Sequence, residues 1–447
     1  MTNSDTKNFS QNVSSSYHLE DRGKYNKNTC ANARNVPKLR FKGYNDEWKH
    51  YRLKDIVKIY DGTHQTPNYI DDGIKFVSVE NIGNLEGTNK YISKVDYDKD
   101  FKIKPEINDI LMTRIGDIGT PAIINTKENY AYYVSLALLK ANQEILFPKF
   151  FVQRILSESF QHELWKRTLH VAFPKKINKN EIGECNVFIC SKSEQEKIAS
   201  FLTLIDKKIE KQKELVELLK KYKRGLLSSI FSQKLRFKDD NGNDYPAWEE
   251  CRFDEIFQIL GNNTLSRECL NYTDAGVKNI HYGDILVKYN TCINDEIDKI
   301  PNINSDINLD KISDDNYLKV GDVIMADTAE DYTVGKACEI VSFKAKILSG
   351  LHTIPCRPKR YFAKGYLGYY LNSAEYHDKL IPLITGIKVS AISKKEIKKT
   401  IIKYPIYMEQ AKIANLLILI ENKLNSNIKK LELLETYKKG LLQQLFI

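Results

Sequence analysis

Residues 194–231, EQEKIASFLTLIDKKIEKQKELVELLKKYKRGLLSSIF, organise this chain of 447 residues. Apolar residues recur there in alternating steps of four and three, the spacing of a coiled-coil seam: Ile198, Leu202, Ile205, Ile209, Val216, Leu219, Leu226 and Ile230. Gln212 and Lys223 are the polar seam positions. The pattern predicts one long helix, roughly 55 Å in length at about 1.5 Å per residue, which needs a partner to bury its seam.

The partner helix is in the same chain, at residues 408–447, MEQAKIANLLILIENKLNSNIKKLELLETYKKGLLQQLFI. It repeats the first helix at an offset of 215 residues, as from Gln195 to Gln410. Its seam contains Ile413, Leu417, Ile420, Leu424, Asn427 and Leu434. We expect the two helices to pair antiparallel as an intramolecular coiled coil that acts as a spacer, with Gln212 close to Asn427.

Length and composition narrow the class of protein. A chain of 447 residues is too long for one core, so several domains are expected. The net charge of +10 favours an acidic partner, most commonly nucleic acid. The eight cysteines form no C-x-x-C pair, which favours free thiols over zinc in a reducing compartment. No apolar run reaches the ~18 residues of a membrane span and the N-terminus is polar, so we expect a cytoplasmic protein.

The segments around the long helices repeat as well. Lys38-Leu39-Arg40-Phe41 returns as Lys234-Leu235-Arg236-Phe237, and Trp48 returns as Trp248. We expect both tryptophans to be packing residues that do not stack on a ligand. Short β-type runs follow each copy, and then a helical stretch, at 149–169 and 361–383. We predict an α+β protein with a polar, disordered lead at 1–36, a first domain at 37–193, a long helix at 194–232, a second domain at 233–407 and a long helix at 408–447.

Motifs for catalysis are absent from the sequence. It has no Pro-Pro dipeptide for an amino-methyltransferase loop, and Ala337 follows Gly335-Lys336 where a phosphate-binding loop needs Ser or Thr. His162-Glu163 has no second His at the spacing of a zinc hydrolase. We therefore predict no catalytic residues and no metal site, although a short nuclease carboxylate cluster stays open.

Candidate DNA contacts occur in both halves. The turn-rich loop 61–67 carries small polar groups that suit base edges in a major groove, and a plain surface turn is an equally good reading. For the first half we select Thr63, His64, Gln65 and Thr66 for bases and Arg114, Lys166, Arg167, Lys175 and Lys176 for phosphates. For the second half we select Asn263, Thr264, Arg267, His281, Tyr282, Lys288, Asp327, Thr328, Lys388 and Ser390.

The paired pattern resembles the specificity subunit of type I restriction-modification enzymes. The resemblance covers residues 37–447 and rests on two E-Q-x-x-I-A helix starts (194–199 and 409–414), two Y-K-[R/K]-G-L-L ends (222–227 and 437–442), the repeated L-R-F…W leads and the loop 61–67. One departure is Cys190, where the second copy has Pro405. We expect this difference to affect how the first helix begins and not whether it forms.

The resemblance implies two target recognition domains that bind the two parts of a split, asymmetric DNA sequence, with the long helices as spacer. It implies that the chain itself has no active site and binds no cofactor. Two modification subunits would supply S-adenosylmethionine-dependent adenine methylation, and restriction subunits would supply ATP- and Mg2+-dependent translocation and cleavage.

Two alternatives stay open from sequence. One is a fused methyltransferase or nuclease with an unrecognised site, which requires cofactor binding by the isolated chain. The other is a coiled-coil scaffold that does not bind DNA, which predicts no salt-dependent affinity for duplex DNA.

Overall fold

The structure is a computed structural model that describes residues 35–273, 276–294, 298–386 and 389–447. The polar lead predicted at 1–36 lies almost wholly outside the described residues. The chain divides into two compact units, the first formed by residues 1–214 and 427–447 and the second by residues 215–426. Among the described helices, none is both long enough and apolar enough to cross a membrane.

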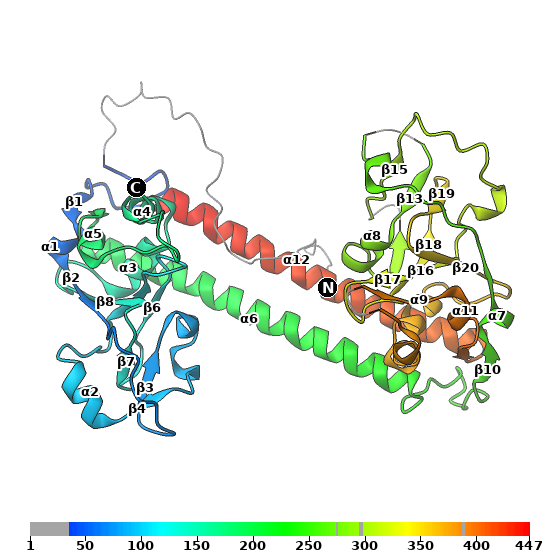
Figure 1. Ribbon diagram of the computed structural model, residues 1–447. Coiled ribbons are helices and arrows are strands. Elements are labelled where there is room, and N and C mark those ends of the chain that lie inside the picture. The colour runs from blue at the N-terminus through cyan, green and yellow to red at the C-terminus, as the bar shows by residue number, and fades with distance from the viewer. Residues whose placement is uncertain (1–34, 274–275, 295–297, 387–388) are drawn as a thin grey trace. The chain divides into compact units, whose positions relative to one another are not determined.

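Unit 1 is built around an antiparallel sheet of strand order β2-β8-β5-β6, beside a three-stranded sheet β4-β3-β7 and a β1-β9 pair (Figure 1). Its strands are β1 Lys49–Arg52, β2 Val57–Asp61, β3 Ile74–Val77, β4 Tyr91–Ile92, β5 Ile110–Thr113, β6 Pro121–Ile123, β7 Tyr130–Tyr132, β8 Leu136–Ala141 and β9 Asn186–Ile189. Its helices besides the long ones are α1 Leu53–Ile56, η1 Val79–Asn81, η2 Leu85–Gly87, α2 Lys94–Asp100, α3 Pro148–Ile155, α4 Glu158–Arg167 and α5 Lys179–Gly183.

Unit 2 repeats this plan around a larger sheet of order β11-β20-β16-β18-β14, with a second sheet β12-β15-β13-β19 and the pairs β10-β22 and β17-β21. Its strands are β10 Glu249–Arg252, β11 Phe257–Ile259, β12 Leu270–Asn271, β13 Lys278–Ile280, β14 Cys292–Asn294, β15 Asn302–Ile303, β16 Val323–Ala326, β17 Thr328–Ala329, β18 Ala337–Ser342, β19 Ile347–Ser349, β20 Thr353–Pro358, β21 Ser390–Ala391 and β22 Ile401–Tyr404. Its shorter helices are α7 Phe253–Ile256, η3 Arg267–Cys269, α8 Tyr282–Val287, η4 Asp314–Asn316, α9 Tyr366–Leu371, α10 Ala374–His377, η5 Ile381–Leu383 and α11 Lys394–Ile397.

Each unit contains two apolar cores, one on each face of its main sheet. In unit 1, Ile110 and Met112 of β5 pack toward the long helices, whereas Leu111 between them packs toward the small sheet. This alternation follows from the two-residue period of side chains along a strand. In unit 2, β16 divides its side chains between two cores in the same way. Trp48 and Trp248 are buried, in agreement with a packing role.

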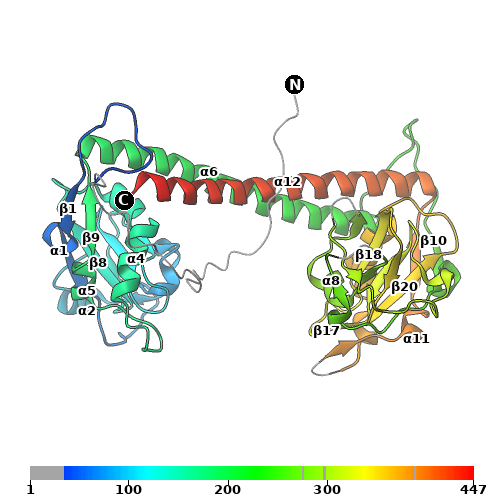
Figure 2. The ribbon, with the colours of Figure 1, turned by 90° about the horizontal axis from the view of Figure 1, so that it is seen from above.

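The long helices are α6, Lys192–Phe231, and α12, Tyr407–Leu445 (Figures 1 and 2). Both begin at equivalent residues, so the exchange of Pro405 for Cys190 leaves the helix start unchanged. Ion pairs join the two helices within each unit and define their direction in unit 1. In unit 1, α6 and α12 are joined by Asp206–Lys438 at 2.5 Å and Lys213–Glu435 at 2.8 Å, and in unit 2 by Lys223–Glu421 at 2.9 Å. The partner numbers fall along α12 as they rise along α6, which confirms antiparallel pairing.

The predicted seam is the inner face of this pair. The residues Ile198, Leu202, Ile205, Ile209, Ile413, Leu417, Ile420 and Leu424 are buried, and Leu219 and Leu434 are partly buried. Gln212 and Asn427, both in unit 1, form a hydrogen bond in which Gln212 Nε2 donates to Asn427 Oδ1 at 3.0 Å. The ion pairs Asp206–Lys438 and Glu421–Lys223 are equivalent, because their acidic residues and their lysines each lie 215 residues apart. The polar contacts of the helix pair therefore also follow the repeat.

The E-Q-x-x-I-A motif attaches each domain to its long helix. The buried carboxylate of Glu194 accepts two hydrogen bonds from Arg40, and Glu409 accepts two from Arg236. The neighbouring glutamine also has one role in both copies. Gln195 Nε2 donates to the Cys190 carbonyl at 2.9 Å, and Gln410 Nε2 donates to the Pro405 carbonyl at 2.8 Å.

Two helix predictions were wrong in extent. The stretch 149–169 forms α3 and α4, which are separated at Ser157, and the stretch 361–383 forms α9, α10 and η5, with a break at Ser373. In each case the serine hydroxyl donates to a carbonyl three residues back, Arg154 or Tyr370, at 2.6 Å. Such local bonding by Ser competes with continuation of a helix. The predicted α+β class, with two repeated domains and two long antiparallel helices, is confirmed.

Candidate nucleic-acid interface

The predicted loop of unit 1 follows β2 and is held at one end by the sheet. Thr63 N donates to the Tyr132 carbonyl at 3.1 Å, and the Thr63 carbonyl accepts from Val134 N at 2.9 Å. Gly62 is required here because a Cβ atom would lie 2.3 Å from the Tyr132 oxygen. The side chains of His64, Gln65 and Thr66 beyond it are exposed and available for contact.

Arg114 is not available for a phosphate, contrary to our expectation. Its guanidinium is buried, forms an ion pair with Asp61 at the end of β2 and donates from Nε to the Ile177 carbonyl at 3.0 Å. Lys179 approaches the same carboxylate at 3.5 Å. Arg114 therefore joins β2, β5 and the segment before α5, next to the base of the loop 63–66.

The other four predicted lysine and arginine contacts of unit 1 fall into two pairs. Lys166 and Arg167 are bound to Glu163, at 3.2 and 3.0 Å. Burial alone would raise the pKa of Glu163, but hydrogen bonds from Asn186 and Lys166 outweigh it and lower the pKa to about 2, so this carboxylate stays charged. Lys175 and Lys176 are exposed, and neither has a carboxylate partner within the described residues. The first pair shares one carboxylate and keeps one net positive charge, whereas the second pair keeps two.

In unit 2, Asn263 and Thr264 lie on the loop that follows β11. Asn263 N donates to the Ser349 carbonyl at 2.9 Å and Thr264 is exposed. Arg267 and Lys288 both pair with the buried carboxylate of Asp284, at 2.7 and 2.9 Å, so they stabilise this carboxylate and keep one net positive charge between them.

A polar and aromatic cluster brings other predicted residues of unit 2 together. Thr328 Oγ1 donates to Asp327 at 2.8 Å, and the same carboxylate lies 3.3 Å from His352 Nδ1. His352 packs edge-on against Tyr282, whose ring lies 4.6 Å from that of His281. Burial, and next the charge of Arg267, lower the pKa of His281, which favours a neutral ring.

His352 was missed by sequence reasoning, because it belongs to no motif and its segment was read only as part of the short strands between 257 and 354. Ser390 lies in β21, paired with Ala329 of β17, and is partly buried. Lys388 lies outside the described residues.

The two loop surfaces occupy equivalent positions on the two frames. The bond from Thr63 N to Tyr132 in unit 1 corresponds to that from Asn263 N to Ser349 in unit 2. Likewise Ile177 N donates to the Arg114 carbonyl, and Ile392 N donates to the Asp327 carbonyl. Each unit thus presents one surface, made from the loop after its first sheet strand, the end of β5 or β16 and the segment before α5 or α11. The side chains on the two surfaces differ.

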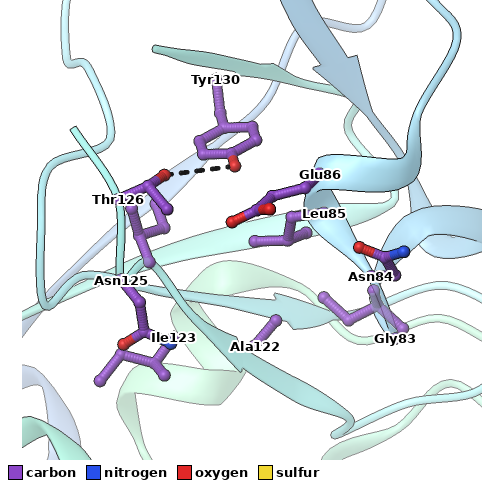
Figure 3. A pocket seen from close by; sticks show the side chains of 11 residues that line it. Gly83, Asn84, Leu85, Glu86, Ala122, Ile123, Asn125, Thr126 and Tyr130 are labelled. Carbon is purple, nitrogen blue, oxygen red and sulfur yellow. Dashed lines mark hydrogen bonds between the residues drawn. The ribbon is translucent and has the colours of Figure 1, made fainter. Parts of the chain in front are cut away.

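The described residues contain no group of three or more His, Cys, Asp or Glu side chains placed to hold a metal ion. A pocket of about 180 Å³ lies in unit 1 between 82–86 and 122–126 (Figure 3). Tyr130 and Thr126 form a hydrogen bond at its rim, at 3.4 Å, and Glu86 points toward them. None of the predicted contact residues lines this pocket.

Comparison with known proteins gives concordant matches. Residues 45–220 match the family model described as type I restriction modification DNA specificity domain. Over 431 residues the chain is 24% identical to the "Putative type I restriction enzyme MjaX specificity subunit" of Methanocaldococcus jannaschii, covering 90% of this chain and 93% of that one.

Two solved structures share the fold. The type I restriction-modification system S subunit from M. genitalium matches with a TM-score of 0.55 and 16% identity, over 92% of this chain and 99% of that one. A chain from a structural study of complex assembly and conformational transition of the type I R-M system matches with a TM-score of 0.53 and 14% identity, over 90% and 98%. Part of the chain thus matches the specificity-domain family model, its whole length is similar to one curated specificity subunit, and its fold is that of the two solved structures.

Proposed function

We propose that this chain is the DNA-recognition subunit of a type I restriction-modification complex, and that it binds a bipartite, asymmetric DNA target. The observation that carries this proposal is the pair of equivalent loop surfaces with different side chains. Base edges are distinguished by the donors and acceptors placed in a groove, whereas a repeated frame carries no sequence information. Two unlike surfaces on like frames therefore suit two unlike half-sites.

We further propose that partner subunits supply the chemistry. The chain would direct adenine methylation and restriction while binding no cofactor itself, with S-adenosylmethionine, ATP and Mg2+ held by two modification subunits and by restriction subunits. Such a complex would act in the cytoplasm, on the DNA found there.

Exposed side chains on the long helices favour a partner subunit that binds in two copies. Three apolar side chains of unit 1 and their equivalents in unit 2 are exposed to nearly the same extent. They are Leu204 (66%), Leu433 (61%) and Tyr437 (55%) in unit 1 and Leu419 (66%), Leu218 (63%) and Tyr222 (56%) in unit 2. Equivalent exposed apolar groups favour equivalent contacts, one with each modification subunit.

The decisive experiment exchanges residues 55–189 for the corresponding segment of a relative and maps methylated adenines in cells that also express the modification subunit. The expected result is a new sequence in one half of the recognised target and an unchanged sequence in the other. The reciprocal exchange of 254–402 is the matched control and should alter the other half alone. Loss of all site preference, or a change in both halves from one exchange, would contradict independent recognition by the two units.

A further inference from the structure

The segment between α4 and α5 in unit 1 forms a projecting loop with an anchored base. Leu169 N donates to the Lys176 carbonyl at 2.8 Å and closes the loop. The Lys175 carbonyl accepts from Gly116 N, also at 2.8 Å, which ties this base to the end of β5. The loop tip therefore has a defined root on the same surface as Arg114 and the loop 63–66.

The tip presents apolar side chains to solvent. Val171 and Phe173 are fully exposed, with relative accessibilities of 99% and 104%. A single exposed apolar residue is ordinary, but here two stand on one short loop beside the half-exposed Trp165. Covering an exposed aromatic ring with a partner is favourable, because it removes apolar surface from water.

Charge next to the tip indicates the class of that partner. Lys175 and Lys176 directly follow the apolar tip, and within the described chain neither ammonium group is paired with a carboxylate. The loop 169–176, LHVAFPKK, contains no acidic residue. Basic groups beside an apolar tip match a polyanion that also offers flat apolar surfaces, which describes stacked nucleic-acid bases between phosphates.

We propose that Phe173, supported by Val171, inserts against the bases of the target DNA as an apolar wedge, with Lys175 and Lys176 on the adjacent phosphates. This inference rests on the proposed function and adds a specificity-determining contact to unit 1. A wedge partly unstacks one base step, and flexible pyrimidine–purine steps deform most easily. The wedge would then select sequence through deformability, in addition to the direct contacts of the loop 63–66.

The test uses the full-length chain in complex with its modification subunits and the target identified by methylation mapping. 2-Aminopurine, whose fluorescence rises when it is unstacked, is placed at successive positions of the half-site bound by unit 1. The wild-type complex should give a rise at one step. Phe173→Ala should abolish that rise and weaken binding roughly tenfold, whereas Phe173→Leu should keep most of both, because bulk and apolarity are what a wedge requires.

The matched control is Tyr361→Ala in unit 2, which removes an aromatic ring that is 96% exposed and has none of the predicted contacts around it. It should leave fluorescence and affinity unchanged. If the wild-type complex binds its target specifically without any rise, or if Phe173→Ala binds normally, the wedge is overturned and the proposed function stands. If Phe173→Ala instead prevents complex assembly, the loop contacts a protein subunit and the wedge is again overturned. If the wild-type complex has no site preference, the proposed function itself fails.

Discussion

The two loop surfaces differ in a way that separates what the fold requires from what recognition requires. At the position where unit 1 places Arg114, held by Asp61, unit 2 places Asp327, held by His352. The backbone bond that anchors each of them to the segment before α5 or α11 is the same. The ion pair that attaches each domain to its long helix does not vary, since Arg40 with Glu194 and Arg236 with Glu409 have the same bidentate geometry. The contacts that attach each domain to its long helix are repeated, whereas the side chains of the two loop surfaces are not.

Removing the arginine that attaches each domain to its long helix should give the largest loss of stability. In Arg40→Ala and Arg236→Ala the buried carboxylates of Glu194 and Glu409 lose their cation. We expect each change to destabilise its own unit by about 3 kcal/mol or more, the cost of an uncompensated buried charge. Chemical denaturation with hydrogen exchange assigned to each unit measures this.

Lys220→Ala is the matched control for those variants, because Lys220 and its partner Glu217 form an exposed pair on α6. Exposed pairs of this kind contribute about 1 kcal/mol at most. An equal and small effect of all three substitutions would show that the Arg–Glu contacts do not hold the domains to the helices.

Changing one loop surface at a time sharpens the comparison at the level of recognition. His64→Ala with Gln65→Ala should weaken specific DNA binding by about 1–3 kcal/mol for each base contact that is lost, with little effect on nonspecific binding. His352→Ala should have the corresponding effect on the other half-site. Competition binding against targets mutated in one half-site measures both. Equal affinity of the variants and the wild type would show that these side chains do not contribute to DNA recognition.

A buried carboxylate distinguishes the cores of the two units. In the sheet of unit 2, Glu339 is paired opposite Val323, and the corresponding pair in unit 1 is Ile123 opposite Ile110. Glu339 accepts bonds from Gly365 N at 2.7 Å and Gly368 N at 2.9 Å. Burial raises its pKa to about 7, and those backbone bonds oppose the rise.

This raised pKa predicts a pH dependence confined to unit 2. Because the folded state holds the Glu339 proton more tightly than the unfolded state, its contribution to stability is fully present below pH 4.5 and is lost as the pH rises through about 7. The slope should reach about 1 kcal/mol per pH unit at most. Glu339→Gln should remove this slope while unit 1 is unaffected. Urea denaturation between pH 5 and pH 8 measures it, and an unchanged slope in the variant would assign the dependence to other groups.

The sequence predicted the frame more completely than the surface. Helix periodicity and the 215-residue offset were sufficient for α6, α12 and the pairing of Gln212 with Asn427, because those contacts follow from local spacing and symmetry. The charge partners of Arg114 and Arg267 could not be predicted, since Asp61 and Asp284 approach them only through the tertiary fold. A lysine or arginine that binds a phosphate and one that neutralises a buried carboxylate look the same in sequence.

The smallest expected effect on stability comes from the polar pair at the seam, Gln212 and Asn427. Their hydrogen bond lies in unit 1 among the apolar side chains of α6 and α12. An amide pair in such a seam is less stabilising than leucine, yet a slipped register would leave an amide without its partner. Gln212→Leu with Asn427→Leu should therefore raise the free energy of unfolding by about 1 kcal/mol and permit alternative registers.

If the helices set the distance between the DNA half-sites, a looser register should appear as a looser preference for spacer length. Methylation mapping on targets with graded spacers should show a broader optimum for the double variant than for the wild type. Insertion of four residues into α6, about one helical turn, should shift the optimum toward longer spacers without broadening it. Lys220→Ala, which alters the exposed face of the same helix, should change neither property. The same optimum in all four proteins would mean that the spacing is set elsewhere in the complex, so that the polar pair serves the fold alone.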